Sequence, residues 1–426
     1  MSKHREGVWT ATSLWRRLGP GLVTGAADDD PSGIATYSQV GARVGYGILW
    51  TALFSFPLMV GIQLVSARIG RVTGKGLAAN IRAHFPAWLL HSVVALLVIA
   101  NTINIAADIG AMGAALKLLV DGPAHWYAAA LGLVSLLLQV FVPFPRYSPV
   151  LKALTLALLA YVVAVFLVNV HWGEVLFRTL VPSIPFQATH VVAVVAVLGT
   201  TISPYLFFWQ ASHEVEEQRA ARGELPLKGA PQQAREQLKR IQLDTYLGMA
   251  LSNLVAFCIM LTAIAGLRAH GITDIQTSAQ AAAALRPLAG DFAFALFAAG
   301  IIGTGMLAVP VLGGSAAYAV AEAFKWRTGL GRRPKNAKGF YAILVIATSL
   351  GVGLNFTPVD PIRALFWSAV INGVIAVPIM AVMMRLAIKR EVMGPFVVTG
   401  WLRVSGWIAT SVMALAVLVM IAVWKT

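Results

Sequence analysis

Three consecutive acids, Asp28, Asp29 and Asp30, precede Pro31 inside an apolar run that is long enough to span a bilayer. Carboxylates hold hard cations or protons, and an ionisable group within a membrane must be paired, hydrated or bound to an ion. Pro31 removes a backbone donor and disfavours helical geometry at Asp30, so the helix is predicted to break there. Helical neighbours point about 100° apart, so at most two of the acids can face one ligand. We expect Asp30 to be that ligand, with Asp28 and Asp29 facing water on the inner side.

A second break is predicted at Ser203 and Pro204, which interrupt another apolar run. The hydroxyl of Ser203 and the main-chain carbonyl of Thr200 would complete an all-oxygen site with Asp30, and such sites suit magnesium, manganese or calcium. A simpler interpretation makes Asp30 an N-cap with Pro31 at the first helical position, an arrangement that Ser203 and Pro204 repeat. We favour the ligand hypothesis, because a cap at mid-membrane does not require a charge.

The composition indicates a polytopic membrane protein. Of 426 residues, 58% are hydrophobic and 12% are charged, and the mean hydropathy is +0.75. The net charge is +15, and the basic residues are concentrated in alternate loops, which is the positive-inside pattern of membrane proteins. We therefore attribute the positive charge to membrane topology and exclude nucleic-acid binding. The single Cys258 offers neither a disulfide nor a metal cluster. No catalytic motif or cofactor-binding loop is present, so we do not expect an enzyme.

Eleven spans are predicted in a cell inner (plasma) membrane, with a cytoplasmic tail at residues 1–17 and the C-terminus outside. One five-helix repeat occupies 18–170, a second occupies 188–384 with cytoplasmic loops at 218–240 and 325–338, and the eleventh span is 404–424. A proline break opens each repeat, and an odd number of spans inverts the second repeat. The predicted spans are 18–43, 46–67, 86–116, 124–143, 150–170, 188–216, 242–267, 291–322, 340–357, 362–384 and 404–424.

Further polar residues lie within the spans. Asn101, Asn104 and Asp108 are spaced i, i+3 and i+7 on one face of the third span, which should face the bundle interior. Hydrogen bonding between helices is an equally good explanation of the two asparagines. His213 and Glu214 are expected to line a hydrated cytoplasmic mouth.

The motif Asp30-Pro-Ser-Gly33 resembles the first-helix signature of the NRAMP divalent-metal transporters, and Gly199-Thr-Thr-Ile-Ser-Pro-Tyr205 resembles their sixth-helix signature. The resemblance implies a leucine-transporter-like fold of two inverted five-helix repeats plus an eleventh helix. It also implies that Asp30 and the Thr200 carbonyl bind metal, and we place Ser203, Gly33 and Asn372 at the same metal site.

The departures from the family pattern favour its magnesium-transporting branch. Gly33 stands where the family has an asparagine, Ser203 where it has a methionine, and Tyr205 where it has a histidine. The family's tenth helix contributes a glutamine that has no clean counterpart here, and we infer that Asn372 takes its place. The family's third-helix acids correspond to Asn104 and Ala107, with Asp108 one place further on as a possible displaced proton carrier.

We therefore expect transport of magnesium or manganese by alternating access, weakly coupled to protons or uncoupled. The alternatives are a proton-coupled manganese or iron importer, an amino-acid or amine transporter in which Asp30 holds the ammonium group, and a non-transporting membrane sensor. The expected partners are the lipid bilayer and the transported ion, with no cofactor and no obligate protein partner.

Overall fold

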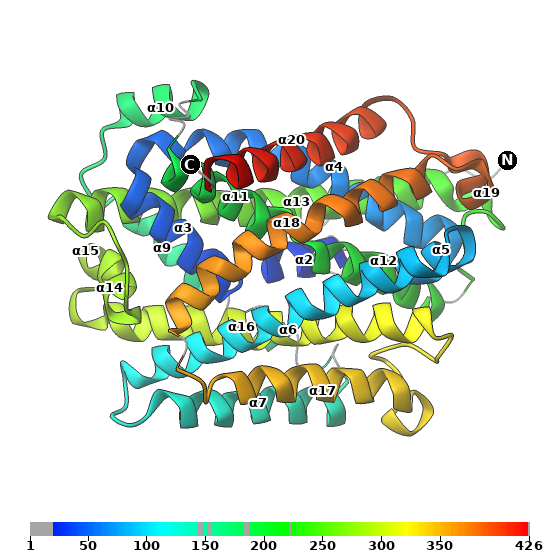
Figure 1. The fold of residues 1–426 in the computed structure, drawn as a ribbon, viewed down its shortest axis with the longest axis horizontal. Helices are drawn as coiled ribbons and strands as arrows, with labels where there is room; N and C mark the ends of the chain where they lie inside the picture. The colour runs from blue at the N-terminus through cyan, green and yellow to red at the C-terminus, as the bar shows by residue number, and fades with distance from the viewer. Residues whose placement is uncertain are drawn as a thin grey trace, which may run out of the picture.

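The computed structural model describes residues 20–143, 146, 149–150, 153, 156–182, 187–221, 223–358 and 360–424. Every regular element in these ranges is helical. The predicted tail at 1–17 lies outside the described residues, as does part of the predicted span at 150–170. Figure 1 shows a bundle in which the longest helices run roughly along one direction, with short helices at both ends.

The principal helices follow the predicted spans in order. They are α2 (Pro20–Asp28), α3 (Pro31–Val44), α4 (Trp50–Thr73), α6 (Ala87–Lys117), α7 (Ala124–Phe141), α9 (Leu159–Val165), α11 (Ala188–Thr201), α12 (Pro204–Ala220), α13 (Ala234–Thr262), α16 (Ala293–Ala323), α17 (Lys338–Leu354), α18 (Pro361–Ala387) and α20 (Gly400–Trp424). Shorter helices cover the ends: α5 (Leu77–His84), α10 (Trp172–Leu180), α14 (Ser278–Ala282), α15 (Arg286–Ala289) and α19 (Arg390–Met393).

Within the described residues, eight helical stretches are long and apolar enough to cross a membrane, α11 and α12 being counted together. The other three predicted spans correspond to the α2–α3 pair, to the region of α9, and to α17. Taken separately, α2 has 9 residues, α3 has 14 and α17 has 17, so each is shorter than the helices counted above.

Both predicted breaks are present. α2 ends at Asp28 and α3 begins at Pro31, while α11 ends at Thr201 and α12 begins at Pro204. Each second half-helix therefore starts at a proline, whose missing N–H is not needed at a first helical position. The start of α2 is also satisfied, because the Gly21 amide donates to the Asp244 carboxylate at 2.7 Å.

The two halves of the bundle pack in equivalent ways. α2 lies along α13 and α12 lies along α4, so each inner half-helix packs against the second helix of the other repeat. Glycine allows each of these two helix pairs to pack closely. A Cβ at Gly25 would lie 2.3 Å from the Gly248 carbonyl oxygen of α13, and a Cβ at Gly70 of α4 would lie 2.2 Å from the Ala211 carbonyl oxygen of α12. This exchange is what two repeats with broken first helices produce.

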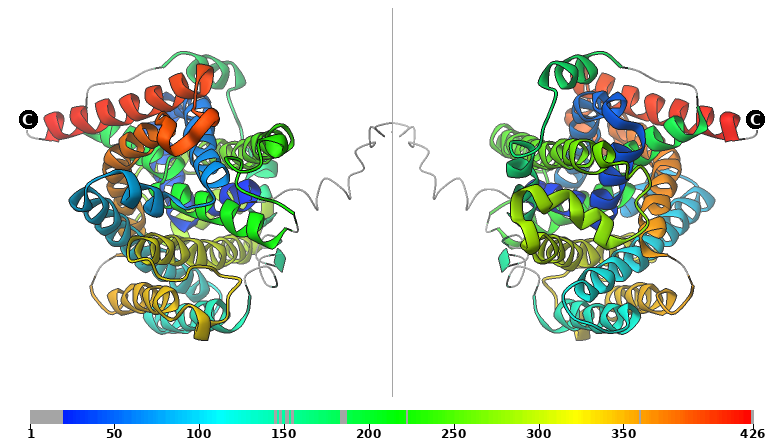
Figure 2. Two further views of the ribbon diagram at one scale, coloured as in Figure 1. Left: turned by 90° about the vertical axis from the view of Figure 1, so that its right-hand side faces the viewer. Right: turned by 90° about the vertical axis from the view of Figure 1, so that its left-hand side faces the viewer.

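α6 and α16, the third helices of the repeats, pack extensively against each other beneath the broken helices. α7 and α17 lie side by side on the far side of this pair, and α20 lies at the opposite edge of the bundle (Figures 1 and 2). The broken helices α2–α3 and α11–α12 are consequently enclosed by α4, α6, α13, α16 and α18.

Candidate functional site

Asp30 stands at the first break and is the N-cap of α3. Its Oδ1 accepts the Gly33 amide at 2.7 Å, and its backbone φ of −68° and ψ of 170° are extended. The capping interpretation is therefore correct in geometry for Asp30, but not for Ser203, whose side chain makes no cap hydrogen bond to α12. It does not exclude ion binding, because a cap bond occupies one oxygen and leaves Oδ2 with room for another partner.

Tyr205, in the first turn of α12, reaches that second oxygen. Its hydroxyl lies 3.2 Å from Asp30 Oδ2 and 2.9 Å from the Ala27 carbonyl oxygen. A phenol has one hydrogen, so it donates to one acceptor at a time. Tyr205 therefore joins the two broken helices without holding the carboxylate permanently.

At the second break, the Ser203 side chain points back toward the last turn of α11. The Ser203 hydroxyl lies 2.8 Å from the Gly199 carbonyl oxygen and 2.9 Å from that of Thr200, and donates to one of them. Side-chain bonds of this type satisfy carbonyls that a broken helix leaves without amide partners. Each carbonyl oxygen has two lone pairs, so Thr200 can still act as a ligand.

Close packing at glycines brings the two breaks together. A Cβ on Gly33 would lie 3.1 Å from the Asp28 carbonyl oxygen and 3.3 Å from Thr200 Oγ1, so the start of α3 lies against the end of α11. α11 also crosses α18 closely, since a Cβ on Gly199 would lie 2.6 Å from the Gly373 amide. Asn372, next in the chain, is buried on α18, and its Oδ1 has no hydrogen-bond partner among the described residues.

The polar face of α6 lies inside the bundle. Asn101, Asn104 and Asp108 are each 0% exposed. Asn101 donates to the Leu312 carbonyl oxygen at 2.8 Å, which is interhelical bonding to α16. The Asn104 side chain has no hydrogen-bond partner in the part of the chain described, whereas Asp108 interacts with the Ser32 backbone amide and electrostatically with Asp30. Buried polar groups of this kind call for a ligand, a proton or water.

Asp28 and Asp29 differ from the sequence expectation. Both are buried, at 1% and 5% exposure, and so do not face inner water in this conformation. The Ser252 hydroxyl on α13 lies 2.7 Å from Asp28 Oδ2 and 3.2 Å from Asp29 Oδ1. The reason is the close packing of α2 against α13 at Gly25 and Gly248.

The expected hydrated mouth is also closed in this conformation. Glu214 is fully buried and forms an ion pair with Arg240 of α13 at 2.5 Å, and Arg240 contacts Glu217 at 2.9 Å. His213 packs against the Trp209 ring with centroids 5.2 Å apart. The acids on α12 thus hold the inner half-helix against α13.

The opposite end of the bundle, where α3 ends, is closed by the residues that follow α13. Gln39 of α3 donates to Asp274 Oδ1 at 2.6 Å and accepts the Ile275 amide at 2.8 Å. Hydrogen bonds from Gln276 and then Gln39 lower the pKa of Asp274 below its usual value. Arg268 donates to the carbonyl oxygens of Ala42 and Arg43 at 3.0 and 2.7 Å.

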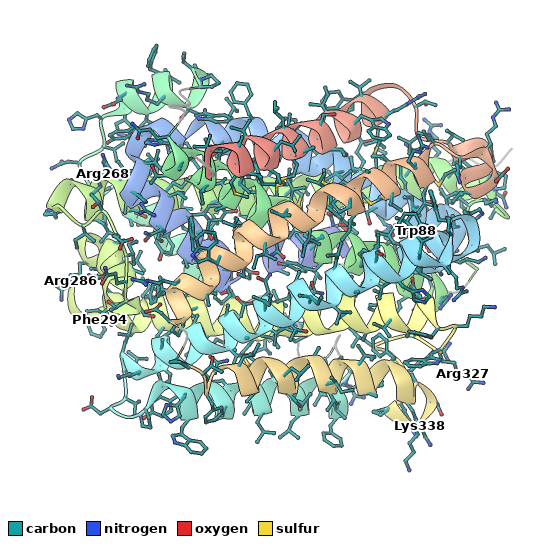
Figure 3. The ribbon with its side chains drawn as sticks, viewed as in Figure 1. Trp88, Arg268, Arg286, Phe294, Arg327 and Lys338 are labelled. Atoms are coloured by element: carbon teal, nitrogen blue, oxygen red, sulfur yellow. The ribbon has the colours of Figure 1, made fainter. Side chains whose placement is uncertain are left out.

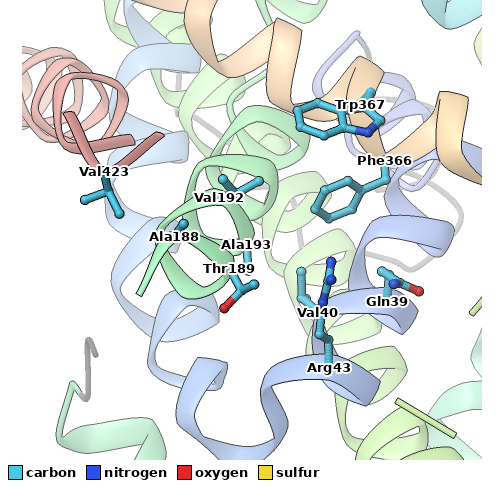
Figure 4. A pocket seen from close by; sticks show the side chains of 10 residues that line it. All are labelled: Gln39, Val40, Arg43, Ala188, Thr189, Val192, Ala193, Phe366, Trp367 and Val423. Carbon is cyan, nitrogen blue, oxygen red and sulfur yellow. The ribbon is translucent and has the colours of Figure 1, made fainter. Parts of the chain in front are cut away.

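A cavity of about 390 Å³ lies on the outer part of the bundle, between α3, α11, α18 and the end of α20. Figure 4 shows Gln39, Arg43 and Trp367 on its wall. Asp30, Thr200, Ser203 and Asn372 do not line it and are each 3% exposed or less. The central site is consequently shut off from both ends.

The geometry supports a small oxygen-lined site. The described residues contain no group of three or more His, Cys, Asp and Glu side chains that could hold a metal ion. One carboxylate, main-chain carbonyls, a hydroxyl and an amide oxygen would instead share the ion with water, as magnesium tolerates.

Sequence reasoning missed several partners of this site. Ser252, Arg240 and Tyr37 carry no motif, and their roles arise from packing between repeats. Tyr37 is buried, and its ring lies 3.4 Å from where a Gly33 Cβ would stand. Ser252 and Tyr37 are polar residues within predicted spans, which was the one available signal for them, whereas Arg240 falls in the predicted loop 218–240.

The fold and the site define a class: an all-helical membrane protein with two broken helices that meet at a buried acidic site, in the leucine-transporter-like arrangement. The chain belongs to the Nramp family, described as natural resistance-associated macrophage protein-like, which matches residues 21–423. It is 26% identical over 407 residues to the divalent metal cation transporter MntH of Klebsiella pneumoniae, covering 93% of this chain and 91% of that protein.

Solved structures agree on the fold. A manganese transporter of Eremococcus coleocola, bound to an aromatic bis-isothiourea compound, superposes with a TM-score of 0.73 at 18% identity, covering 99% of this chain and 89% of the other. Mhp1, a nucleobase-cation-symport-1 transporter in a closed conformation, gives a TM-score of 0.58 at 13% identity, with 96% and 92% covered. The predicted fold class is thus confirmed.

Proposed function

We propose that this chain carries divalent metal cations across the membrane by alternating access, with magnesium or manganese as the preferred ions. The observation that supports this most is the meeting of the two breaks: Asp30 lies against α12 through Tyr205, and Gly33 lies against Thr200. Family membership and relatives named as divalent metal cation transporters support the same class of substrate.

The ligand set favours a hard ion. Ser203 offers oxygen where the family resemblance implies a thioether, and Gly33 offers no side-chain ligand. An ion at this site would keep part of its hydration shell, since a single carboxylate and neutral oxygens make up the protein ligands. Gln63, Ser66 and Ser315 anchor α12 through the carbonyl oxygens of its first turn, so the second break is supported from α4 and α16.

A second candidate is a proton-coupled importer of manganese or iron. The manganese transporter of E. coleocola and the MntH relatives favour it. The replacement of a methionine and a histidine by Ser203 and Tyr205 argues against it, because neither side chain is a soft ligand or titrates near neutral pH.

Ion uptake by the purified chain in liposomes tests the proposal directly. Asp30→Asn keeps an N-cap oxygen but removes the charge, so it separates the capping role from the ligand role. We expect Asp30→Asn to abolish magnesium and manganese uptake while the protein remains folded.

Asp360 is a matched control, because it caps α18 before Pro361 and accepts the Arg363 amide at 3.0 Å. Asp360→Asn should transport normally. Full transport by Asp30→Asn would refute the site.

We also propose that the N-terminus and the 325–338 loop face the cytoplasm of a multi-pass plasma-membrane protein. A cysteine introduced by Lys335→Cys should react with impermeant reagent only from that side, and the buried native Cys258 provides a low background. Reaction from outside would reverse the proposed orientation.

A further inference from the structure

A second cavity lies at the inner end of the bundle, away from the central site. Its volume is about 310 Å³, and it opens between α5, α12, α16 and the residues just after α16. None of the residues assigned above to ion binding lines it. Figure 3 labels Trp88, Arg327 and Lys338 near this end of the molecule, opposite Arg268, Arg286 and Phe294.

The cavity has four basic side chains, Lys75, Arg82, Arg219 and Lys325. The ion pairs found in the described part of the chain involve none of them. The cavity also contains Glu216 and Glu322, so the cations exceed the carboxylates by two, and this excess favours a negatively charged ligand.

The two acids of the cavity offset only part of this charge. Glu322 interacts electrostatically with Arg219 and Arg82, and Glu216 with Arg219, which leaves four cations facing two carboxylates. Glu322 accepts the Ala79 amide at 3.1 Å and the Ser212 hydroxyl at 3.0 Å. Glu216 accepts the Tyr318 hydroxyl and the Leu330 amide. The carboxylates thus tie α5, α12 and α16 together and form the floor of the cavity.

The backbone at the rim is unusual. Lys325 has a φ of 59°, and it is the one non-glycine residue with positive φ among those described. The Trp326 amide donates to the Ala321 carbonyl oxygen at 2.7 Å, so Lys325 is the left-handed residue of the C-cap that ends α16 beside the basic opening.

Aromatic side chains place this opening at a membrane interface. Trp326 lines the cavity, and its ring stacks on exposed Phe324 with centroids 5.4 Å apart. Phe324 also contacts the His91 ring of α6, one turn beyond Trp88, which is 68% exposed. Tryptophan at headgroup depth is typical of membrane interfaces, and basic pockets between helices on the cytoplasmic side bind anionic lipid headgroups.

We propose that this cavity binds the phosphate group of an anionic phospholipid of the cytoplasmic leaflet. The bound phosphate bridges α5, α12 and the end of α16, and so stabilises the closed inner end described above. This inference does not depend on which ion the central site carries.

The test uses the full-length protein in detergent, with phosphatidylglycerol or phosphatidylcholine added and binding followed by native mass spectrometry. Lys75→Gln with Lys325→Gln removes two exposed charges that make no ion pair. Each basic residue near anionic lipid contributes about fivefold to binding, so we expect roughly 30-fold weaker phosphatidylglycerol binding. Lys335→Gln with Lys338→Gln removes the same number of charges from the 325–338 loop outside the cavity, and should change binding by less than about twofold, since distant charges are screened.

Three results would overturn the proposal. One is an equal loss in both double variants, which would indicate general surface charge. Another is equal binding of phosphatidylcholine. The third is thermal stabilisation by millimolar inorganic phosphate with none by phosphatidylglycerol, which would make the ligand a soluble phosphate. Matching unfolding temperatures of the two double variants without lipid would exclude misfolding as the cause of lost binding.

Discussion

The phenol of Tyr205 lies within hydrogen-bonding distance of two acceptors on the opposite broken helix, Asp30 Oδ2 at 3.2 Å and the Ala27 carbonyl oxygen at 2.9 Å. Because a single hydrogen serves both, a cation arriving at Asp30 can take the carboxylate while the phenol turns to Ala27. The contact can therefore keep the empty site ordered without competing strongly with the ion.

Replacing Tyr205 by histidine should make uptake sensitive to pH. Imidazole titrates near pH 6.5, so its protonated form would place a positive charge beside Asp30 and oppose ion binding. We expect uptake by Tyr205→His to fall as the pH drops from about 8 to about 5.5, measured in liposomes under a fixed membrane potential.

Tyr205→Phe is the control for this histidine variant. It loses one hydrogen bond, worth about 1 kcal/mol of stability, but adds no titratable group, so its pH profile should match that of the wild type. A pH profile of Tyr205→His identical to that of Tyr205→Phe would show that position 205 does not face the ion.

Ser203→Met should shift ion preference toward manganese and cadmium. A thioether is a soft ligand from which magnesium gains little, and loss of the hydroxyl frees the Gly199 and Thr200 carbonyl oxygens. Competition of cadmium with magnesium uptake measures the shift.

Ser203→Ala frees the same carbonyls without adding sulfur, so it should not increase cadmium competition. The further change Gly33→Asn should strengthen the shift only if Thr200 yields, since even a Cβ there would lie 3.3 Å from Thr200 Oγ1. Unchanged competition in Ser203→Met would place selectivity elsewhere, for example at Asn372.

Arg240→Gln should destabilise the inner end, because Glu214 is fully buried and would lose its cation. Breaking a buried pair by removing one partner costs on the order of 3 kcal/mol, so the thermal unfolding midpoint should fall clearly. Lys239→Gln removes a neighbouring exposed charge with no ion pair among the described residues and should leave the midpoint unchanged. Combining Arg240→Gln with Glu214→Gln should restore part of the loss. Equal midpoints for Arg240→Gln and Lys239→Gln would refute the structural role of the pair.

Local rules predicted both helix breaks. Pro31 and Pro204 act on their own backbone, so their effect is visible in the sequence. What the sequence did not reveal depends on partners far along the chain. Asp28 and Asp29 look exposed beside a break, yet Ser252, more than 220 positions away, binds them. The sequence predicts that Glu214 lines an open entrance. The packing of α12 near α13 instead places Arg240 against Glu214 as an ion-pair partner.

The Gln39 and Asp274 contact at the outer end predicts a pH range. The two amide donors favour the ionised carboxylate, so the pKa of Asp274 lies below 3.8. A lowered folded-state pKa means that the stabilisation is present above the unfolded value and is lost as the pH falls through the folded value. This contact should therefore persist between about pH 5 and 8, and Asp274→Asn should leave the pH profile of uptake in that range unchanged. A profile altered by Asp274→Asn would contradict the ionised contact.

The last prediction concerns the coupling of metal transport to protons, and it depends on Asp108. Asp108 is buried and interacts electrostatically with Asp30, so a cation that arrives at Asp30 could displace a proton from Asp108. For that proton to drive transport, it must reach the inner end. Along α6 the next titratable residue toward that end is His91, beyond Asn104 and Asn101, which do not titrate.

We therefore predict transport that is uncoupled or weakly coupled to protons. The membrane potential alone favours cation entry by about 2.3 kcal/mol per charge per 100 mV. Liposomes with a trapped pH dye measure both fluxes at once, and magnesium uptake should proceed without matching acidification of the lumen. Asp108→Asn is nearly isosteric, and it should retain uptake because Asp30 still supplies the charge that binds the ion. Acidification in step with uptake, abolished by Asp108→Asn, would show instead that Asp108 carries the proton in place of the family's third-helix acids.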